Sequence, residues 1–217
     1  MKTYDITLKF ISDWHIGTGI GLPGVSDNML LRDNNGFPFI PGRSIRGVLR
    51  DTHEKLWKLE HLKGISHLRP SVIWGTHKLR DKNTHSQTGK WRVEDGIWDA
   101  YKNTSLQHAP EDIRNIWLNE ISFVSPRISL DENHKAKNQQ LGFIELGRKD
   151  MTFDAKIYRH DGSEFEKDEL NLLRLLLLHT QRIGGTRRRG KGRVEMTLAR
   201  DGSRAEMLEK WRAGNNV

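Results

Sequence analysis

The sequence predicts an α+β domain with the element order strand, helix, strand, strand, helix, strand. Apolar and polar residues alternate at 4–10, 151–157 and 194–198, which is the period of strands with one buried face. Apolar residues recur at helical spacing after Ser44, and the leucine-rich stretch 170–179 is apolar nearly all round, as in a buried helix. This order is that of a ferredoxin-like fold with a βαββαβ core, which RNA-recognition domains also use.

Local signals place the first helix and the loop before it. The glycine-rich stretch 15–24 follows the first strand and cannot hold regular structure. Ser44 comes two residues after the segment 37–42 and is expected to be the N-cap of the helix. The residues that then fall on one helical face are Ile45, Val48, Leu49, Thr52, Leu56 and Leu59.

The remaining segments fit one domain with additions. From about 60 to 118 the periodicity weakens, so we expect a mobile insertion there, with a short strand at 91–98. A thumb-like β-hairpin is expected at about 125–150, and the last residues favour a short helix. The chain is therefore predicted to be a single domain over residues 1–217.

Composition narrows the class of protein and of partner. The 217 residues include 36 Lys and Arg against 28 Asp and Glu, which gives a net charge of +8 and favours a polyanion as partner. The chain has no run long enough to span a membrane and shows no leader at its N-terminus, so we expect a cytoplasmic protein without a membrane partner. With no cysteine, it has no disulfide, thiolate zinc site or cysteine nucleophile.

The positive charge is concentrated in one segment. Residues 182–193 read RIGGTRRRGKGR, with six positive charges, four glycines and no acid. Glycines allow backbone N–H groups to approach a phosphate, and arginines add bidentate donors. A solvated basic loop is the alternative. We favour RNA contact here, through Gly184, Gly185, Arg187, Arg188, Arg189 and Lys191.

The start of the first helix and the end of the first strand supply further candidates. Ser44 and Arg46 fall in the first helical turn, where free N–H groups and the helix dipole attract phosphate, although an ordinary cap with a solvated arginine is the alternative. His15 can contact RNA or carry a proton, and it can equally be a satisfied, partly buried side chain.

Two other residue groups favour structural explanations. The histidines of the 60–118 stretch and its surroundings have spacings that match no metal-ligand template, so we expect no zinc. Trp74, Trp91 and Trp98 can stack on bases, but their strand-like positions favour the core.

Five motifs follow one another along nearly the whole chain. They are HIGTG (15–19), FIPGRSIRGVLR (39–50), IWGT (73–76) leading to GKWRVEDG (89–96), PRISLDENHKAKNQQLGFIE (126–145) and RIGGTRRRGKGRV (182–194). In this order they resemble the motifs of the RAMP superfamily, and most of all those of the small repeated backbone subunit of type III CRISPR-Cas interference complexes.

The resemblance implies a protein that polymerises along a CRISPR RNA and cuts the paired target RNA at regular intervals, with help from Mg²⁺ or Mn²⁺. It implies further partners: copies of the chain itself, a large polymerase-like subunit, a small helical subunit and other RAMP subunits. The hairpin would be the thumb that wedges into the guide–target duplex. Arg43 stands where the family usually has a small hydroxyl residue, so the contact with the guide backbone at this position is expected to differ from that of the family.

Asp27 matches the acidic residue that the family requires for target cleavage, and Asp33 matches a less critical acid. A carboxylate near the ribose 2′-hydroxyl, or a metal that it holds, can assist attack on the adjacent phosphate. Taken from the residues alone, an Asp before Asn28 in a glycine-rich loop favours a turn instead. In either case we expect an exposed residue that contributes little folding energy.

Three alternatives stay open at this point. One is a purely structural or capping RAMP subunit in which Asp27 is idle. The second is a guide-processing endoribonuclease of the same superfamily, which is usually built from two such domains, whereas 217 residues leave room for one. The third is a basic RNA-binding domain with no part in defence.

Overall fold

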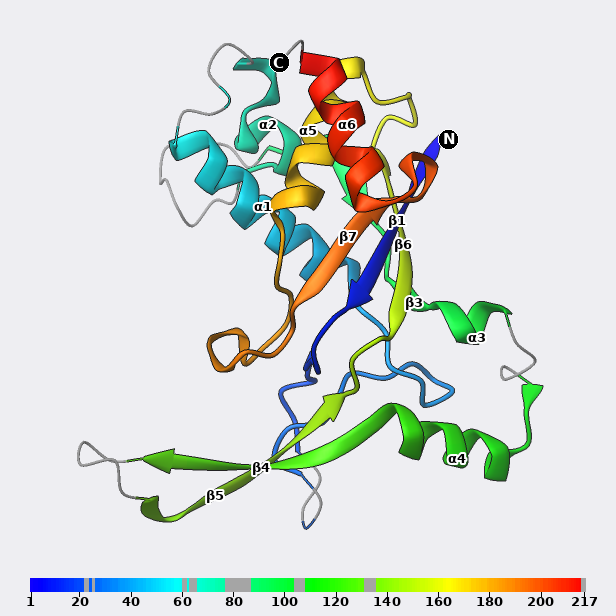
Figure 1. Cartoon of the computed structure of the whole chain (residues 1–217), viewed down its shortest axis with the longest axis vertical. Helices are drawn as coiled ribbons and strands as arrows, with labels where there is room; N and C mark the ends of the chain where they lie inside the picture. Colours follow the sequence, from blue (N-terminus) through cyan, green and yellow to red (C-terminus); the bar gives the residue numbers. More distant parts are fainter. Residues whose placement is uncertain are drawn as a thin grey trace.

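The computed structural model describes residues 1–21, 24, 26–59, 62, 66–76, 87–103, 108–130 and 136–215 (Figure 1). Its core is an antiparallel sheet in the order β2-β6-β1-β7, with β3 also paired to β6. The strands are β1 (Thr3–Phe10), β2 (Trp91–Val93), β3 (Ile97–Trp98), β6 (Thr152–Arg159) and β7 (Val194–Leu198).

This sheet is that of a ferredoxin-like fold, so the predicted fold class is confirmed. In β1 the alternating residues Tyr4, Ile6, Leu8 and Phe10 are buried, as their period of two requires. β1 lies in the centre, between β6 and β7, and its register pairs Ile6 with Ala155 on one side and with Leu198 on the other.

Three long helices pack around the sheet. α1 (Gly42–Lys58) and α5 (Lys167–His179) are the two helices of the βαββαβ core, and α6 (Arg204–Asn215) packs against α5 and β7. Nearly all leucines of α5 are buried, because α1, α6 and the sheet surround this helix.

The first helix begins earlier than the sequence predicts. Its first residue is Gly42 and its N-cap is Pro41, so Ser44 lies inside the first turn and caps nothing with its side chain. The amide of Gly42 instead donates to the Asp95 carboxylate at 2.7 Å, which satisfies one of the free N–H groups of this helix end.

The stretch 60–118 contributes to the core in its described part. It contains the short helices η1 (Ser66–Leu68), α2 (Pro70–Trp74) and α3 (Asp99–Asn103), and the longer α4 begins at its end (Glu111–Ile121). α4 is not predicted by the sequence analysis, which expects only weak periodicity up to about residue 118. Residues 77–86 of the expected mobile insertion lie outside the described residues.

Three tryptophans of this stretch belong to the core, as expected. Trp74, Trp91 and Trp98 are each at most 7% exposed. The Trp91 ring stacks on Phe165 with 4.8 Å between centroids and meets Trp74 edge-on. Base stacking on these rings is therefore not available.

A long β-hairpin projects from the core. It is formed by β4 (Ser122–Leu130) and β5 (Ala136–Gly147), with Pro126 opposite Phe143 and Ile128 opposite Leu141. One face of the hairpin is apolar and exposed, and its members are Val124, Pro126, Ile128, Leu141 and Phe143. In Figure 1 the hairpin lies below the core, with α4 leading into it.

Two short 3₁₀ turns complete the described elements, η4 (Arg187–Arg189) and η5 (Ala199–Asp201). Among the helices of the described residues, none is long and apolar enough to cross a membrane.

A buried histidine makes the stability of the fold dependent on pH. His53 on α1 is fully buried and accepts a hydrogen bond from Trp74 Nε1 at 3.0 Å. Burial lowers the pKa of His53 from 6.5 to about 4, because the charged ring has lost its hydration. The folded protein therefore resists protonation at a pH where the unfolded chain accepts it.

We predict that the free energy of unfolding falls as pH is lowered from about 6.5 to about 4. The difference between these two pKa values corresponds to about 3 kcal/mol for one proton. Urea unfolding over this range should give a steeper loss for the wild type than for His53→Asn, which keeps an acceptor for Trp74 but does not titrate. Equal slopes for the two proteins would contradict the assignment.

Candidate nucleic-acid interface

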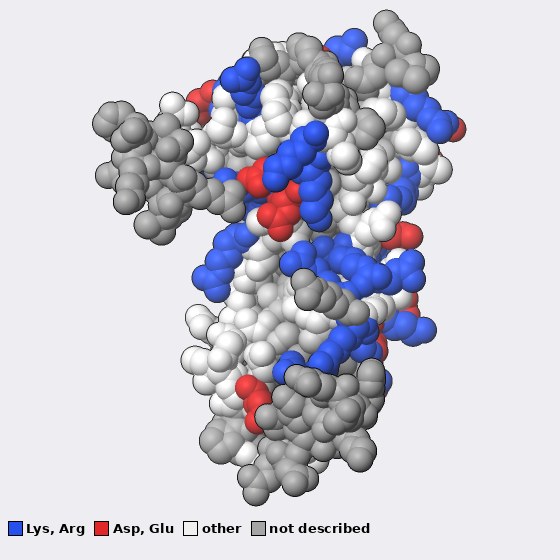
Figure 2. Space-filling view, turned by 90° about the vertical axis from the view of Figure 1, so that its left-hand side faces the viewer, with Lys and Arg blue, Asp and Glu red and all other residues white. Residues whose placement is uncertain are grey.

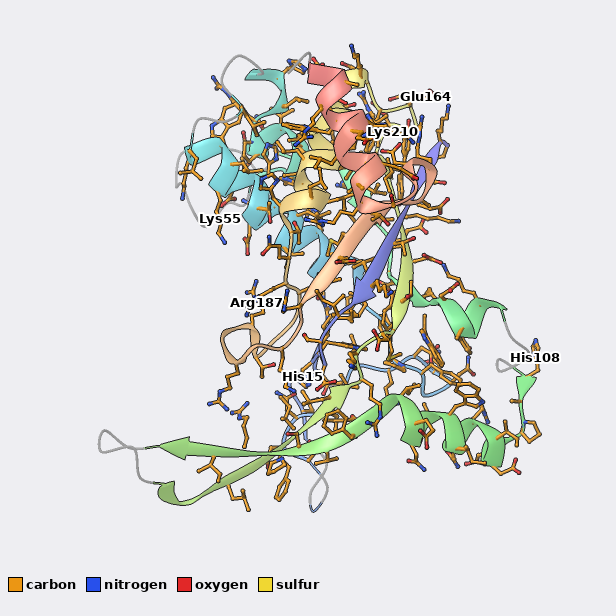
Figure 3. The ribbon with its side chains drawn as sticks, in the orientation of Figure 1. His15, Lys55, His108, Glu164, Arg187 and Lys210 are labelled. Carbon is orange, nitrogen blue, oxygen red and sulfur yellow. The ribbon has the colours of Figure 1, made fainter. Side chains whose placement is uncertain are left out.

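Segments that are far apart in the sequence meet where β1 ends. The turn 12–17 leaves the sheet after Phe10 and contacts both the basic glycine-rich loop, 182–193, and the base of the hairpin. The amide of Gly192 donates to Asp13 O at 2.8 Å, and the amide of Gly185 donates to His15 O at 2.7 Å. In Figure 3, His15 lies between the glycine-rich loop and the hairpin.

Glycine is required where the loop meets this turn. Gly184 has φ +93, a conformation that side chains rarely adopt, and a Cβ at this position would overlap the carbonyl oxygen of His15. The amide of Gly185 is bonded within the protein, so it is not a free phosphate donor. The glycines therefore dock the loop, and the arginines between them carry its exposed charge.

His15 is 4% exposed and is held by one ring nitrogen. Its Nδ1 lies 2.7 Å from the carbonyl oxygen of Glu145, while its Nε2 is buried without a partner among the described residues. Asn28 Oδ1 is likewise buried and unpaired, and both atoms lie so close to Gly17 that a Cβ there would overlap them. Unpaired buried polar atoms are rare, and they mark a place where a polar ligand can bind.

The loop that carries Asp27 is bonded along the edge of β5. The amide of Asp27 donates to Phe143 O at 2.9 Å, and the hydroxyl of Ser26 donates to the same oxygen at 3.1 Å. Asn28 then forms a parallel bridge with Ile144. The loop is thus held along the edge of the hairpin by main-chain bonds and one isolated bridge.

Asp27 is exposed, but its carboxylate forms a hydrogen bond within the fold. Its Oδ2 accepts a hydrogen bond from the Phe143 amide at 2.6 Å. Gly142 leaves room for this carboxylate, since a Cβ there would lie 2.9 Å from Asp27 Oδ2. The bond fixes one oxygen against β5, and Oδ1 is the oxygen that can face a ligand.

A buried carboxylate fixes the base of the hairpin. Glu145 is 5% exposed, and it accepts hydrogen bonds from the Leu30 amide and the Ser122 hydroxyl, both at 2.9 Å. The Arg32 guanidinium forms an ion pair with it. Through its main chain, Glu145 also accepts from His15 and donates to Asn28 O.

The basic loop presents arginines to solvent. Arg187 and Arg189 are exposed, whereas the side chain of Arg188 lies outside the described residues. Lys191 forms an ion pair with Asp13 at 2.8 Å, so part of its charge is neutralised. Thr186 has φ 56, and its buried hydroxyl has no partner among the described residues, a further unfilled polar position.

A second basic site lies at the start of α1. A cavity of about 400 Å³, the arginine pocket, is lined by Arg43, Arg46, Arg50 and Arg92. Burial lowers the pKa of Arg46, and the charges of Arg92 and Arg50 lower it further. An anion in the pocket would relieve this repulsion.

The bonds within the arginine pocket leave most of this charge uncompensated. Arg46 donates to Trp74 O, and Arg92 donates to the carbonyl oxygens of Gly89 and Trp91, both at 3.1 Å. Main-chain carbonyls orient the guanidinium groups but do not neutralise them. The Nε atom of Arg46 is buried without a partner among the described residues.

A second basic cavity lies between α1 and the glycine-rich loop. It has a volume of about 530 Å³, and Lys55, Arg182 and Arg187 contribute to its lining. Lys55 and Arg187 lie on the same side of the molecule in Figure 3. Figure 2, which views that side, shows Lys and Arg side chains gathered across the middle of the face. This arrangement can follow a chain of phosphates.

The described residues contain no group of three or more His, Cys, Asp or Glu that could hold a metal ion on its own. Asp33 is committed to a turn, because its Oδ1 accepts from the amides of Asn35 and Phe37, both at 2.9 Å. Mg²⁺ often takes only one or two protein carboxylates and completes its shell with water and substrate phosphates. The free oxygen of Asp27 fits such a single ligand.

A comparison of the sequence with models of protein families shows the family of this chain. The sequence matches the profile of the RAMP superfamily over residues 7–195. The chain belongs to the RAMP superfamily. A comparison with curated proteins finds no match.

Solved structures share the fold of this RAMP protein. A chain in the "Type III-B Cmr-beta Cryo-EM structure of the Apo state" has a TM-score of 0.63 and 14% identity, and the match covers 92% of this chain and 98% of that one. A chain in the "Cryo-EM structure of the Type III-B Cmr-beta bound to cognate target RNA" has a TM-score of 0.64 and 13% identity, with 93% and 98% covered.

The structure brings the candidates together in two places. His15 bonds to the glycine-rich loop and to the hairpin that holds Asp27, whereas Arg43 and Arg46 line the arginine pocket. Ser44 is half-buried beside this pocket and does not line it. The sequence analysis missed residues whose partners are distant, which are Lys55, Arg50, Arg92 and Glu145.

We predict that replacing Arg187, Arg188 and Arg189 with Ala weakens the binding of RNA to a similar extent whatever the sequence of the RNA. Each lost phosphate contact removes about 0.7 from the slope of log affinity against log salt for a single strand, so the slope should fall by up to about 2. The measurement is a filter-binding titration over a series of salt concentrations.

The matched control replaces Lys156, Lys167 and Arg212, which are exposed and lie outside the loop and both cavities. It removes the same charge and should leave the slope close to that of the wild type. An unchanged slope for the loop variant would contradict the phosphate contacts of the loop. An equal loss in both variants would assign the effect to net charge.

Proposed function

We propose that this RAMP protein is a guide-RNA-binding backbone subunit of a type III CRISPR effector complex. In this proposal, copies of the chain follow one another along the guide, together with the other subunits of the complex. The observation that carries it is that the turn after β1 connects the exposed basic loop with the hairpin, on whose edge the Asp27 loop lies. The fold shared with chains of Cmr-beta structures, one of them bound to target RNA, supports the choice of complex.

The guide backbone would bind the basic face. Arginine pairs with phosphate through parallel N–H donors. Both the arginine pocket and the loop offer guanidinium groups that have no carboxylate partner among the described residues. The exception is Arg50, which pairs with Glu54. Main-chain carbonyls already orient Arg46 and Arg92, so little side-chain entropy is lost on binding. These contacts read the backbone and carry no sequence preference.

The apolar face of the hairpin supports a role in handling the paired strands. Val124 is 42% exposed, Ile128 is 52% exposed and Leu141 is 58% exposed, although apolar side chains of this size are usually covered. Such a face can pack against unstacked bases, as apolar wedges do in other nucleic-acid complexes. Asp27 lies at the edge of this same hairpin.

The proposed reaction is attack of a target ribose 2′-hydroxyl on the adjacent phosphorus. The new bond joins the 2′-oxygen to phosphorus while the proton of the 2′-hydroxyl passes to Asp27 Oδ1. The bond to the 5′-oxygen breaks, and that oxygen takes a proton from water, leaving a cyclic phosphate and a 5′-hydroxyl. Asp27 Oδ1 would accept a hydrogen bond from the attacking hydroxyl and orient it, while the Phe143 amide holds Oδ2. A divalent metal at Asp27, when bound, would supply charge stabilisation for the phosphate oxygens.

A purely structural RAMP subunit is the second candidate, and one observation favours it. The Asp27 carboxylate already has a fold role, because its bond to the Phe143 amide holds the loop on β5. The two candidates differ only in what the second carboxylate oxygen does.

The variant Asp27→Asn separates these candidates. Its side-chain oxygen can still accept from the Phe143 amide, so the loop position and the unfolding midpoint should change little, whereas the negative charge is lost. We predict that cleavage of a labelled complementary RNA by the assembled complex falls about a hundredfold or more, the usual size of a lost acid–base contribution. The assay uses Mg²⁺ or Mn²⁺, with chelator as the control.

The matched control is Asp33→Asn, which keeps an acceptor for the turn amides and removes a charge six residues away. It should cleave near the wild-type rate. Cleavage by Asp27→Asn at the wild-type rate, or an absence of metal-dependent cleavage by the wild type, favours the structural subunit.

A further inference from the structure

Three cavities formed by described residues meet at Gln181, two residues after the end of α5. Gln181 lines the basic cavity beside α1, an apolar groove between α5 and α6, and a polar cavity at the start of β7. The basic cavity belongs to the face on which the proposed function places RNA. The groove and the polar cavity have no part in that function, and they adjoin one another because Gln181 and Arg204 line both.

The groove between α5 and α6 can hold a flat, apolar ring. It has a volume of about 620 Å³, and its apolar lining comes from Leu175, Leu178, Leu208 and Trp211. Ala205 lines the groove and is exposed, so the groove opens to solvent at this small residue. A nucleobase has two apolar faces, and it packs on aromatic and aliphatic side chains.

Polar groups at the rim of the groove can bind the edge of such a ring. His179 lines the groove, and its Nδ1 lies 3.0 Å from Leu175 O. A carbonyl oxygen only accepts, so Nδ1 carries the hydrogen, and Nε2 of the neutral ring is an acceptor. The carboxamide of Gln181 adds a donor and a second acceptor. A few polar groups of this kind fix the orientation of a ligand in an apolar pocket.

The adjoining polar cavity has the charge that suits a phosphate. It has a volume of about 270 Å³, and Arg182, Arg193 and Arg204 line it together with one acid, Glu195. None of the three arginines forms an ion pair with another described residue. The cavity therefore carries an excess of positive charge that an anion can neutralise.

Main-chain oxygens already orient two of these guanidinium groups. Arg204 donates to Leu178 O, and Arg182 donates to Arg187 O. Because these bonds hold the side chains in place, less side-chain entropy is lost when an anion binds.

We propose that the groove and the polar cavity form one composite site for a nucleoside phosphate. The base lies in the α5–α6 groove, and the phosphates lie against the arginines of the polar cavity. The shared chemistry is that of a base and a phosphate joined by a ribose, which either a free nucleotide or the unpaired end of an RNA strand supplies.

The composite site is distinct from the site of the proposed function and does not rest on it. In Figure 1, α5 and α6 lie toward the upper end of the molecule, whereas the hairpin that holds Asp27 lies at the lower end. Contacts to a guide backbone involve phosphates alone, and they leave an apolar groove without a purpose.

Calorimetric titration of the whole chain with three ligands tests whether the two halves act together. ADP carries both a base and phosphates, adenosine lacks the phosphates, and pyrophosphate lacks the base. At roughly 0.15 M salt, where exposed charges are screened, ADP should bind about tenfold or more tightly than either part, because only ADP occupies both cavities.

Two variants locate the binding. Ala205→Glu puts bulk and a negative charge into the groove, and its exposed position should leave folding unaffected, which circular dichroism will check. It should weaken ADP binding about tenfold or more. Arg204→Gln keeps a donor for Leu178 O and removes a charge, so it should weaken ADP and pyrophosphate but not adenosine. The matched control is Ala213→Glu, which is exposed on the same helix outside the groove and should bind ADP like the wild type.

A short linear RNA and its circular form distinguish the two sources of the ligand. Binding of ADP that is lost in Ala205→Glu assigns the site to a free nucleotide. If ADP does not bind, but Ala205→Glu weakens the linear RNA and not the circular one, the site holds the end of a strand.

Three results would overturn the proposal. The first is pyrophosphate that binds as tightly as ADP, which would leave only a basic surface. The second is a variant Ala205→Glu that binds ADP and linear RNA as the wild type does. The third is an absence of ADP binding with equal losses for linear and circular RNA. Failure of the proposed function is measured separately, because Ala205→Glu should cleave complementary RNA at the wild-type rate.

Discussion

The buried Glu145 carboxylate is the interaction on which the functional end of the molecule depends. Removing a carboxylate from water costs several kcal/mol unless hydrogen bonds and an opposite charge replace the lost hydration. Here Leu30, Ser122 and Arg32 supply them. These partners come from the loop after β1 and from the start of the hairpin, so neither segment can shift without leaving the carboxylate unpaired. The position of Asp27, a few residues before Leu30, follows from this constraint.

The basic loop combines glycine with arginine because the two residue types have separate roles. Close packing of Gly184 and Gly185 on His15 fixes the loop by its main chain and leaves Arg187 and Arg189 exposed. In the arginine pocket, carbonyl oxygens hold Arg46 and Arg92. In both places these arginines have no carboxylate partner among the described residues, whereas Lys191 pairs with Asp13 and Arg50 pairs with Glu54.

The sequence predicts the βαββαβ core and the hairpin because periodicity reports which side of an element is buried. The alternation in β1 and the leucines of α5 depend only on neighbouring residues. Periodicity does not predict helix α4, because the apolar residues of this helix face solvent and not the core. The roles of Glu145 and Arg92 are not predicted either, since only the fold brings their partners close to them. The resemblance to a family, and not periodicity, singles out Asp27.

The central claim is that RNA lies across the junction of the glycine-rich loop, the Asp27 loop and the hairpin. Photocrosslinking tests it most directly, with a guide-like RNA that carries 4-thiouridine and mass spectrometry to identify the attached peptides. The account predicts crosslinks in residues 182–193 together with crosslinks in the hairpin or in residues 26–32. Crosslinks confined to α4, α5 and α6, or spread evenly over the surface, would contradict it.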